Sequence, residues 1–154
     1  MRRKGFTLIE LMIVIAIIAI LAVIALPGML RSRMAANEAN AIGALRTIYN
    51  AELQFQVSRI KIVNNVPQFG SFTELGAVSP PLLAQELGGV ANPVKQGYLY
   101  TYTGGADPEI PTFTITATAQ SDRKGSRNFF VDESGVIRWT PQTNGDAGVA
   151  DLPI

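Results

Sequence analysis

The sequence contains no cysteine and no histidine among its 154 residues. Without cysteine the chain can form neither a disulfide framework nor a thiolate metal site. Histidine is the commonest general base and the commonest metal ligand, so its absence argues against most classes of enzyme. Charge is also sparse, because Asp, Glu, Lys and Arg make up only 16% of the chain and the net charge is +1. A nucleic-acid-binding protein would carry a basic surface, which this balance does not indicate.

Charge is missing above all from residues 11–30, which contain no charged side chain. Twenty helical residues span about 30 Å, the thickness of the hydrocarbon core of a bilayer. Arg2, Arg3 and Lys4 precede this apolar run, and a short basic tail of this kind keeps the N-terminus in the cytoplasm. The pattern therefore predicts a helix that crosses a membrane once.

Glu10 lies about one turn inside the apolar segment. A carboxylate in hydrocarbon is strongly disfavoured unless it is paired, so an acid inside a membrane is a functional candidate. The nearest possible cation is the α-amino group that would form at Phe6 if the chain were cut after Gly5. The alternative for Glu10 is a carboxylate that reaches the membrane edge or takes up a proton.

Two ordinary interpretations of the N-terminal segment fit less well. A secretory signal peptide would have a shorter apolar run and a cleavage site of the Ala-x-Ala kind. A plain signal anchor would leave Glu10 without an explanation.

Residues 3–12, Arg-Lys-Gly-Phe-Thr-Leu-Ile-Glu-Leu-Met, resemble the prepilin leader and cleavage motif of type IV pilins and type II secretion pseudopilins. The resemblance implies that a prepilin peptidase cuts between Gly5 and Phe6 and N-methylates Phe6. It also implies that Glu10 attracts the Phe6 terminus of a neighbouring subunit during assembly. The resemblance is close over residues 1–56 and holds only in outline beyond them.

This resemblance also implies how the chain is divided. Residues 1–5 would be a leader that is removed, which would change the net charge from +1 to −2. Residues 6–30 would be a transmembrane helix that later forms the filament core. Residues 31–154 would hold an amphipathic helix and a globular head, and the fold class is α+β and pilin-like, with one long helix on a small antiparallel sheet.

The long helix is expected to run from Phe6 to Val57. Pro27 has no N–H to offer the carbonyl of Val23, and Gly28 follows it, so we predict a helix break here in the form of a kink or a locally loosened turn. The second half is amphipathic, with apolar residues at helical spacing. They are Ala41, Ile42, Leu45, Ile48, Tyr49, Leu53 and Phe55.

Charged residues along this helix leave alternatives open. Glu52 falls within the apolar stripe, where a salt link to a lysine or arginine is the one explanation that the sequence offers. Arg31 and Arg33 follow the apolar run. They anchor the helix at the outer headgroups, or they form an inter-subunit salt bridge with an acid such as Glu38.

The sequence of the globular half predicts turns followed by strands. Residues 64–70 are turn-rich and end the long helix, residues 71–76 suggest a short turn, and residues 80–89 suggest one or two helical turns. Strands are predicted at residues 98–103, 112–119, 128–131 and 136–139, with Gly135 able to take a positive φ in the last hairpin. We therefore expect an antiparallel sheet of three or four strands on the amphipathic helix, and an irregular tail over residues 140–154.

Binding sites in this half are weakly indicated. Tyr98, Tyr100 and Tyr102 share one face of a strand, which is more typical of packing than of a binding strip. Residues 123–127 form a short basic loop that we expect to face solvent. Calcium is a possible ligand, although solvated surface acids are the better interpretation. The acids concerned are Asp107, Glu109, Asp122, Asp132, Asp146 and Asp151.

The sequence thus predicts a non-enzymatic structural subunit of a type IV pilus-like filament. The resemblance implies identical subunits, prepilin peptidase and the inner-membrane assembly machinery as partners, with the lipid bilayer before assembly. It places the precursor in the bacterial inner membrane and the product in a cell-surface pilus. Alternatives are a type II secretion pseudopilin in a periplasmic pseudopilus, and a single-span membrane protein with a periplasmic binding domain.

Overall fold

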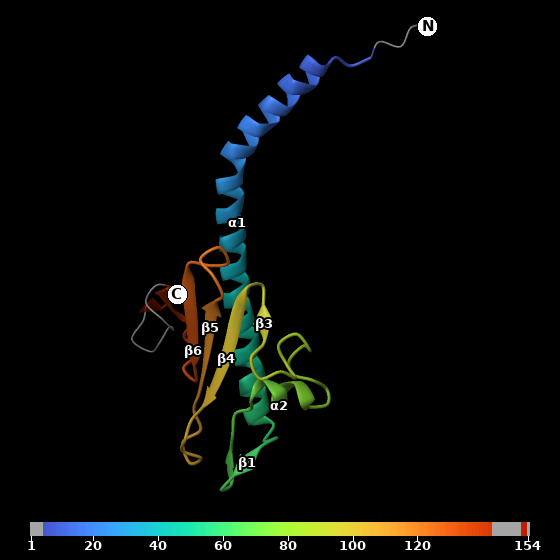
Figure 1. The fold of residues 1–154 in the computed structure, drawn as a ribbon. Coiled ribbons are helices and arrows are strands. Elements are labelled where there is room, and N and C mark those ends of the chain that lie inside the picture. Colours follow the sequence, from blue (N-terminus) through green and yellow to red (C-terminus); the bar gives the residue numbers. More distant parts are fainter. Residues whose placement is uncertain (1–4, 143–151, 154) are drawn as a thin grey trace. The chain divides into compact units, whose positions relative to one another are not determined.

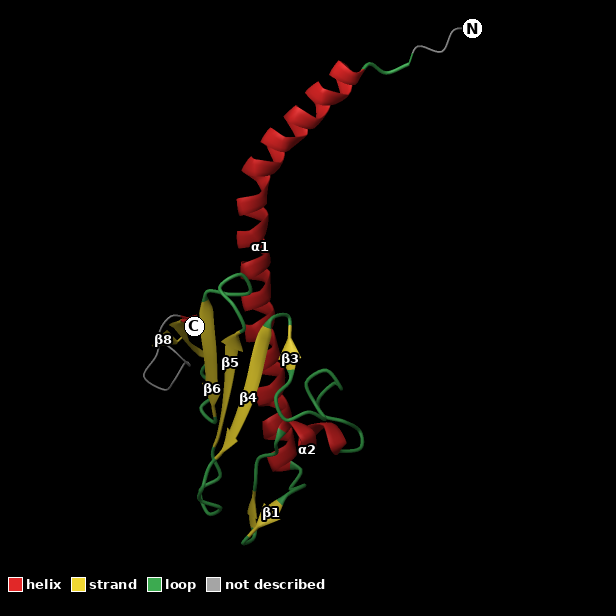
Figure 2. Ribbon diagram, viewed as in Figure 1, coloured by secondary structure: helices red, strands yellow, loops and turns green. Residues whose placement is uncertain are grey.

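A computed structural model describes residues 5–142 and 152–153. The chain divides into two compact units, Met1–Arg33 and Met34–Ile154, and we call the second unit the head. One helix, α1 (Leu8–Val57), begins in the first unit and ends in the second. Figure 1 traces the elements along the chain, and Figure 2 shows that the strands of the described residues all lie in the head. The predicted α+β class, a long helix with an antiparallel sheet, is confirmed.

Helix α1 begins two residues later than the predicted start at Phe6. It continues through Pro27 and Gly28 without leaving the helical conformation, and the Ser32 Oγ donates a hydrogen bond of 3.1 Å to the Gly28 carbonyl oxygen. Because Pro27 has no N–H, the Val23 carbonyl oxygen still lacks its helical partner. A kink or local loosening at this turn stays a prediction.

The larger of the two antiparallel sheets among the described residues of the head has strands that follow each other in chain order. It has six strands rather than three or four. The four longer strands match the predicted ones, whereas the two short edge strands have only two residues each and were not expected. The strands are β3 (Val94–Lys95), β4 (Tyr98–Gly104), β5 (Phe113–Ala119), β6 (Arg127–Asp132), β7 (Arg138–Pro141) and β8 (Leu152–Pro153).

The C-terminal tail differs from the prediction in its described parts. Thr140 and Pro141 belong to β7, and β8 pairs with β7 through Trp139↔Leu152. Residues 143–151 and 154, including Asp146 and Asp151, lie outside the described residues. The tail is therefore not irregular throughout, because its last residues add a strand to the sheet.

Large and small side chains alternate across the centre of the sheet. Tyr98 pairs with Ala119 and Tyr100 pairs with Ala117, so each buried ring lies opposite a methyl group. The Tyr98 hydroxyl donates to the Arg127 carbonyl oxygen at 2.8 Å. A buried Tyr needs a hydrogen-bond partner for its hydroxyl, and Tyr98 has one. The arrangement therefore agrees with the prediction that the tyrosines on this strand face serve packing.

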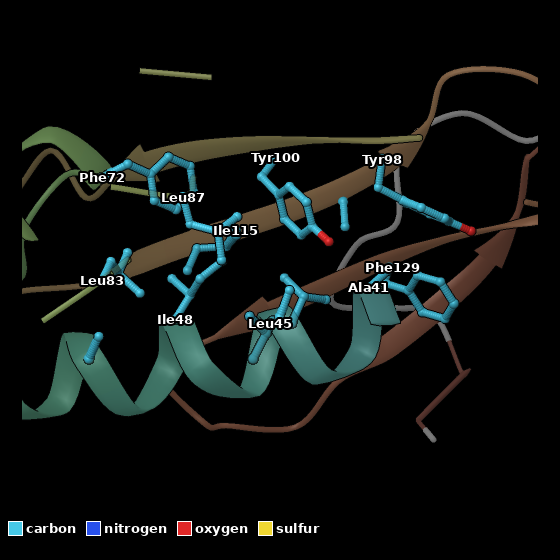
Figure 3. Packing of buried hydrophobic residues seen from close by; sticks show 14 of the residues in the cluster. Ala41, Leu45, Ile48, Phe72, Leu83, Leu87, Tyr98, Tyr100, Ile115 and Phe129 are labelled. Carbon is cyan, nitrogen blue, oxygen red and sulfur yellow. The ribbon is translucent and has the colours of Figure 1, made fainter. Parts of the chain in front are cut away.

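One face of α1 forms the other wall of the core. Leu45 and Ile48 are fully buried and point toward Tyr100 and Ile115 of the sheet (Figure 3). Burying one such aliphatic side chain stabilises a fold by about 1.5–3 kcal/mol. The predicted stripe is confirmed except at Leu53, which is exposed.

The chain between α1 and the sheet is more ordered than its sequence suggested. β1 (Ile62–Val63) and β2 (Val66–Pro67) form a hairpin whose turn residues, Asn64 and Asn65, both have positive φ. Asn tolerates this region better than most residues, which explains the turn. The long helix had already ended at Val57, so this turn-rich segment closes a hairpin and not the helix.

Of two further segments of this connection, the first corrects the prediction and the second agrees with it. Residues 72–77 form a short helix, α2 (Phe72–Ala77), and not a turn, because Ser71 and Glu74 make a capping box. Residues 84–88 form a single turn, in which the Gly88 N–H donates to the Ala84 carbonyl oxygen at 2.8 Å. Phe72, Leu83 and Leu87 from these segments cover one end of the core (Figure 3).

Gly76 is expected to be intolerant of any side chain. A Cβ atom at Gly76 would lie 2.6 Å from the Gly89 nitrogen and 2.8 Å from the Gly88 carbonyl carbon. Gly76→Ala should therefore destabilise the head by about 1–3 kcal/mol, the usual cost of overpacking. Urea unfolding of the full chain in detergent, followed by Trp139 fluorescence, measures this.

Gly43→Ala is the matched control. Gly43 lies in α1, is exposed and has no atom within 4 Å of an added Cβ. Alanine there should stabilise by about 0.5–1 kcal/mol through helix propensity. If both variants shift the urea midpoint of unfolding in the same direction, the close approach of Gly88 and Gly89 does not restrict the side chain at position 76.

Candidate functional site

The N-terminus of α1 is closed by Thr7 and Glu10. The Thr7 N–H and the Thr7 hydroxyl each donate to Oε2 of Glu10 at 2.8 Å, while the Glu10 N–H donates to Thr7 Oγ1 at 3.4 Å. These reciprocal bonds form a capping box, in which two otherwise unpaired helix donors are satisfied. One carboxylate oxygen of Glu10 is thus held within its own chain.

The bond between Gly5 and Phe6 lies outside the helix, which begins only at Leu8. Phe6 is 86% exposed, and nothing lies within 4 Å of the position where Gly5 would carry a Cβ. The two predicted cleavage residues are therefore both accessible. They lie one turn or less before the capping box.

The apolar half of α1 has no protein partner among the described residues of its own unit. The large apolar side chains from Leu8 to Leu30 are 46–77% exposed. By length and composition, α1 is the one helix among the described residues that could cross a membrane. A helix that is apolar on every face needs lipid or other helices around it.

A family model described as the prokaryotic N-terminal methylation motif matches residues 1–26. The chain carries a prepilin-type methylation motif. This motif is typical of type IV pilins and type II pseudopilins, and the resemblance seen in residues 3–12 is thereby confirmed. No curated protein and no solved structure matched the chain.

The prepilin-type motif implies a structural, non-enzymatic protein that begins as a membrane-anchored precursor. It also implies processing by prepilin peptidase and contact with an assembly machinery. It does not specify the type of fibre, because pilins and pseudopilins share it.

A second polar cluster joins α1 to the sheet within the head. Glu38 accepts hydrogen bonds from the Ser126 N–H at 2.8 Å and the Ser126 hydroxyl at 2.9 Å through Oε1. Its Oε2 accepts from Arg127, from Nε at 2.9 Å and from Nη2 at 2.6 Å. We call Glu38, Ser126 and Arg127 the Glu38 cluster.

The electrostatics of the Glu38 cluster favour the ionised carboxylate. Burial by itself raises the pKa of Glu38, but the Ser126 donors and Arg127 outweigh it, so the pKa lies below its ordinary value. The Arg127 guanidinium also lies 5.3 Å from the Trp139 ring centre and 5.7 Å from that of Phe129. Arg127 is therefore held by a carboxylate and by two aromatic faces.

This cluster changes two expectations. Glu38, which was considered as a partner for Arg31 or Arg33 of another subunit, already pairs with Arg127 of its own chain. Arg127 was assigned to a solvent-facing loop, yet it begins β6 and is half-buried. Arg31 and Arg33 are exposed and form no ion pair with any described residue, so the headgroup role and a salt bridge with another acid of a neighbouring subunit both stay predictions.

Glu52 is a buried acid without an ion pair among the described residues. Its Oε2 accepts the Gly70 N–H at 2.9 Å, while Oε1 has no hydrogen-bond partner there. The salt link considered for it is absent from this part of the chain, because Lys61 pairs with Glu74 at 2.8 Å. Burial raises the pKa of Glu52 to about 8, and the Glu74 charge adds to this while the Gly70 N–H and Lys61 oppose it.

The acids considered for calcium are not brought together in the described residues. No group of three or more acidic side chains lies close enough there to hold one metal ion. Asp132 instead pairs with Arg138 at 3.2 Å, and its carboxylate also accepts from the Ser134 N–H at 3.0 Å. Asp146 and Asp151 lie outside the described range.

Thr7 and Arg127 were not singled out from the sequence. Thr7 had a readable signal, because Thr-x-x-Glu before an apolar run is the pattern of a capping box. Arg127 had none, since it lies 89 positions from Glu38 and only the folded sheet brings them together.

Proposed function

We propose that this chain is the structural subunit of a type IV pilus-like filament. The precursor sits in the inner membrane through residues 8–30, is cut after Gly5, is methylated at Phe6 and assembles through its N-terminal helix. The observation that supports this best is the prepilin-type motif over residues 1–26, on an apolar helix whose side chains are exposed in the described part of the chain.

The capping box gives Glu10 a defined role in this scheme. Its Oε2 is held by Thr7, which remains in the chain after a cut between Gly5 and Phe6. Its Oε1 makes no hydrogen bond within the described residues. A cationic Phe6 terminus from an adjacent copy can therefore pair with Glu10 without displacing the cap, as a charge-assisted hydrogen bond.

Glu10→Gln tests the assembly step. The variant keeps the shape of the side chain and its cap to Thr7 but removes the charge that pairs with the Phe6 terminus. We expect normal insertion and cleavage, with at least about tenfold fewer filaments, because a buried cation left without its partner is strongly disfavoured. Intact-mass analysis reports cleavage and methylation, and electron microscopy counts the filaments.

Glu133→Gln is the control, since this exposed head carboxylate makes no side-chain hydrogen bond or ion pair within the described residues. Filaments in normal number from the Glu10 variant would remove the proposed role of Glu10. Wild-type cells that hold only the uncut, dispersed chain would remove the proposed function and favour the anchored binding protein. Loss of protein export on deletion, without surface fibres, would favour the pseudopilin.

A further inference from the structure

Two loops at opposite ends of β5 carry exposed charges of opposite sign. Residues 121–124, between β5 and β6, present Arg123 and Lys124, and we call them the basic loop. Residues 105–112, between β4 and β5, present Asp107 and Glu109, and we call them the acidic loop. None of these four side chains forms an ion pair with another described residue.

These two loops cannot neutralise each other within one molecule. β5 has seven residues between them, which is about 23 Å at the usual rise of a strand. Exposed charges that are further apart than the Debye length, about 8 Å at physiological ionic strength, are largely screened from each other. Asp122 offsets one charge of the basic loop, which keeps a net positive charge.

Both loops are held in place by hydrogen bonds. The Asn37 Nδ2 group of α1 donates to the Lys124 carbonyl oxygen at 2.9 Å. The Gln68 side chain donates to the Pro108 carbonyl oxygen at 2.8 Å, and the two ends of the acidic loop are joined by the Gly105 N–H, which donates to the Thr112 carbonyl oxygen at 2.8 Å. Fixed loops lose little conformational entropy on binding, so their charges are prepared for a partner.

A partner with the required charges is a second copy of the chain. An open filament needs a heterologous contact, in which two different patches of one subunit meet the complementary patches of its neighbours. The basic and acidic loops lie at opposite ends of one sheet and are therefore two such patches.

We propose that the basic loop of one copy pairs with the acidic loop of the next copy, forming a contact between heads in addition to the packing of the N-terminal helices. This inference rests on the proposed function, because the contact forms only when the chain assembles. It fixes the direction of neighbouring heads through complementary charge.

Charge reversal at Arg123 and Glu109 tests the contact, since neither side chain makes a hydrogen bond or ion pair within the described residues. Arg123→Glu and Glu109→Arg should each lower the filament yield at physiological salt by roughly tenfold, because like charges then face each other across the contact. The combined variant should restore most of the yield. Glu86→Lys is the control and should leave the yield unchanged, because Glu86 forms only an exposed pair with Lys95 at 3.0 Å.

Several outcomes would overturn the inference. Single reversals without effect, or a combined variant that stays defective, show that the two loops do not meet. If Asp146→Asn with Asp151→Asn reproduces the loss seen with Arg123→Glu, the basic loop pairs with its own tail instead. Absence of filaments from the wild-type chain overturns the proposed function together with this inference, whereas filaments that tolerate every reversal overturn this inference alone.

Discussion

Arg127→Ala is expected to destabilise the head by about 3–5 kcal/mol, the cost of leaving a buried carboxylate without its counter-charge. The Glu38 side chain is only 7% exposed and would lose both guanidinium hydrogen bonds. The variant would also lose the contacts of Arg127 with the Phe129 and Trp139 rings. Because Trp139 is itself affected, calorimetry of the full chain in detergent is the better measurement.

Glu38→Ala should cost less, about 1–3 kcal/mol, although it breaks the same ion pair. The Arg127 side chain is 39% exposed, so water can solvate the guanidinium once the carboxylate is gone. The two single variants and the double variant form a cycle that isolates the coupling between the residues. If Arg127→Ala and Glu38→Ala lowered the free energy of unfolding equally, the difference in burial between the two side chains would not determine the cost.

The folding stability of the wild-type head is expected to fall as the pH rises, because Glu52 ionises. Glu52→Gln should remove this fall. The pKa of Glu52 is raised by burial from its ordinary value of 4.5 to about 8 in the folded head. The folded state therefore binds this proton more tightly than the unfolded state does. The contribution to stability is complete below pH 4.5 and is lost as the pH rises through about 8, by a few kcal/mol in total.

Glutamine keeps the acceptor for the Gly70 N–H and cannot ionise. The variant should match the wild type near pH 5 and exceed it near pH 9, as measured by urea unfolding with Trp139 fluorescence. Glu109→Gln, which changes an exposed carboxylate, should leave the pH dependence of the wild type intact. A Glu52→Gln profile that still falls between pH 5 and pH 9 would place the titrating group elsewhere.

The parts of the fold that sequence predicts are those fixed by local pattern. The uncharged run over residues 11–30 and the spacing of Leu45 and Ile48 each carry enough signal to define one helix. Phe113, Ile115, Ala117 and Ala119 alternate along β5 and predict its buried face without further information. The cleavage motif is also local, which explains why ten residues pointed to the correct family of motifs.

The missed features depend on residues that are distant in the chain. The pairing of Glu38 with Arg127 forms only after β6 has joined the sheet, so neither residue shows it in its own neighbourhood. Glu52 interrupts an apolar stripe, and its partner is a backbone N–H at Gly70, which side-chain patterns cannot reveal. The two-residue strands β3 and β8 are too short to produce a recognisable alternation.

The Glu38 cluster has a further consequence for the environments that the head can tolerate. Many exported proteins of this size fasten distant segments with a covalent sulfur bridge, which fails in a reducing medium. Here α1 is connected to the sheet by the ion pair between Glu38 and Arg127, and the chain has no cysteine. Thiol reductants should therefore leave the head intact, whereas strong acid, by protonating Glu38, should loosen it.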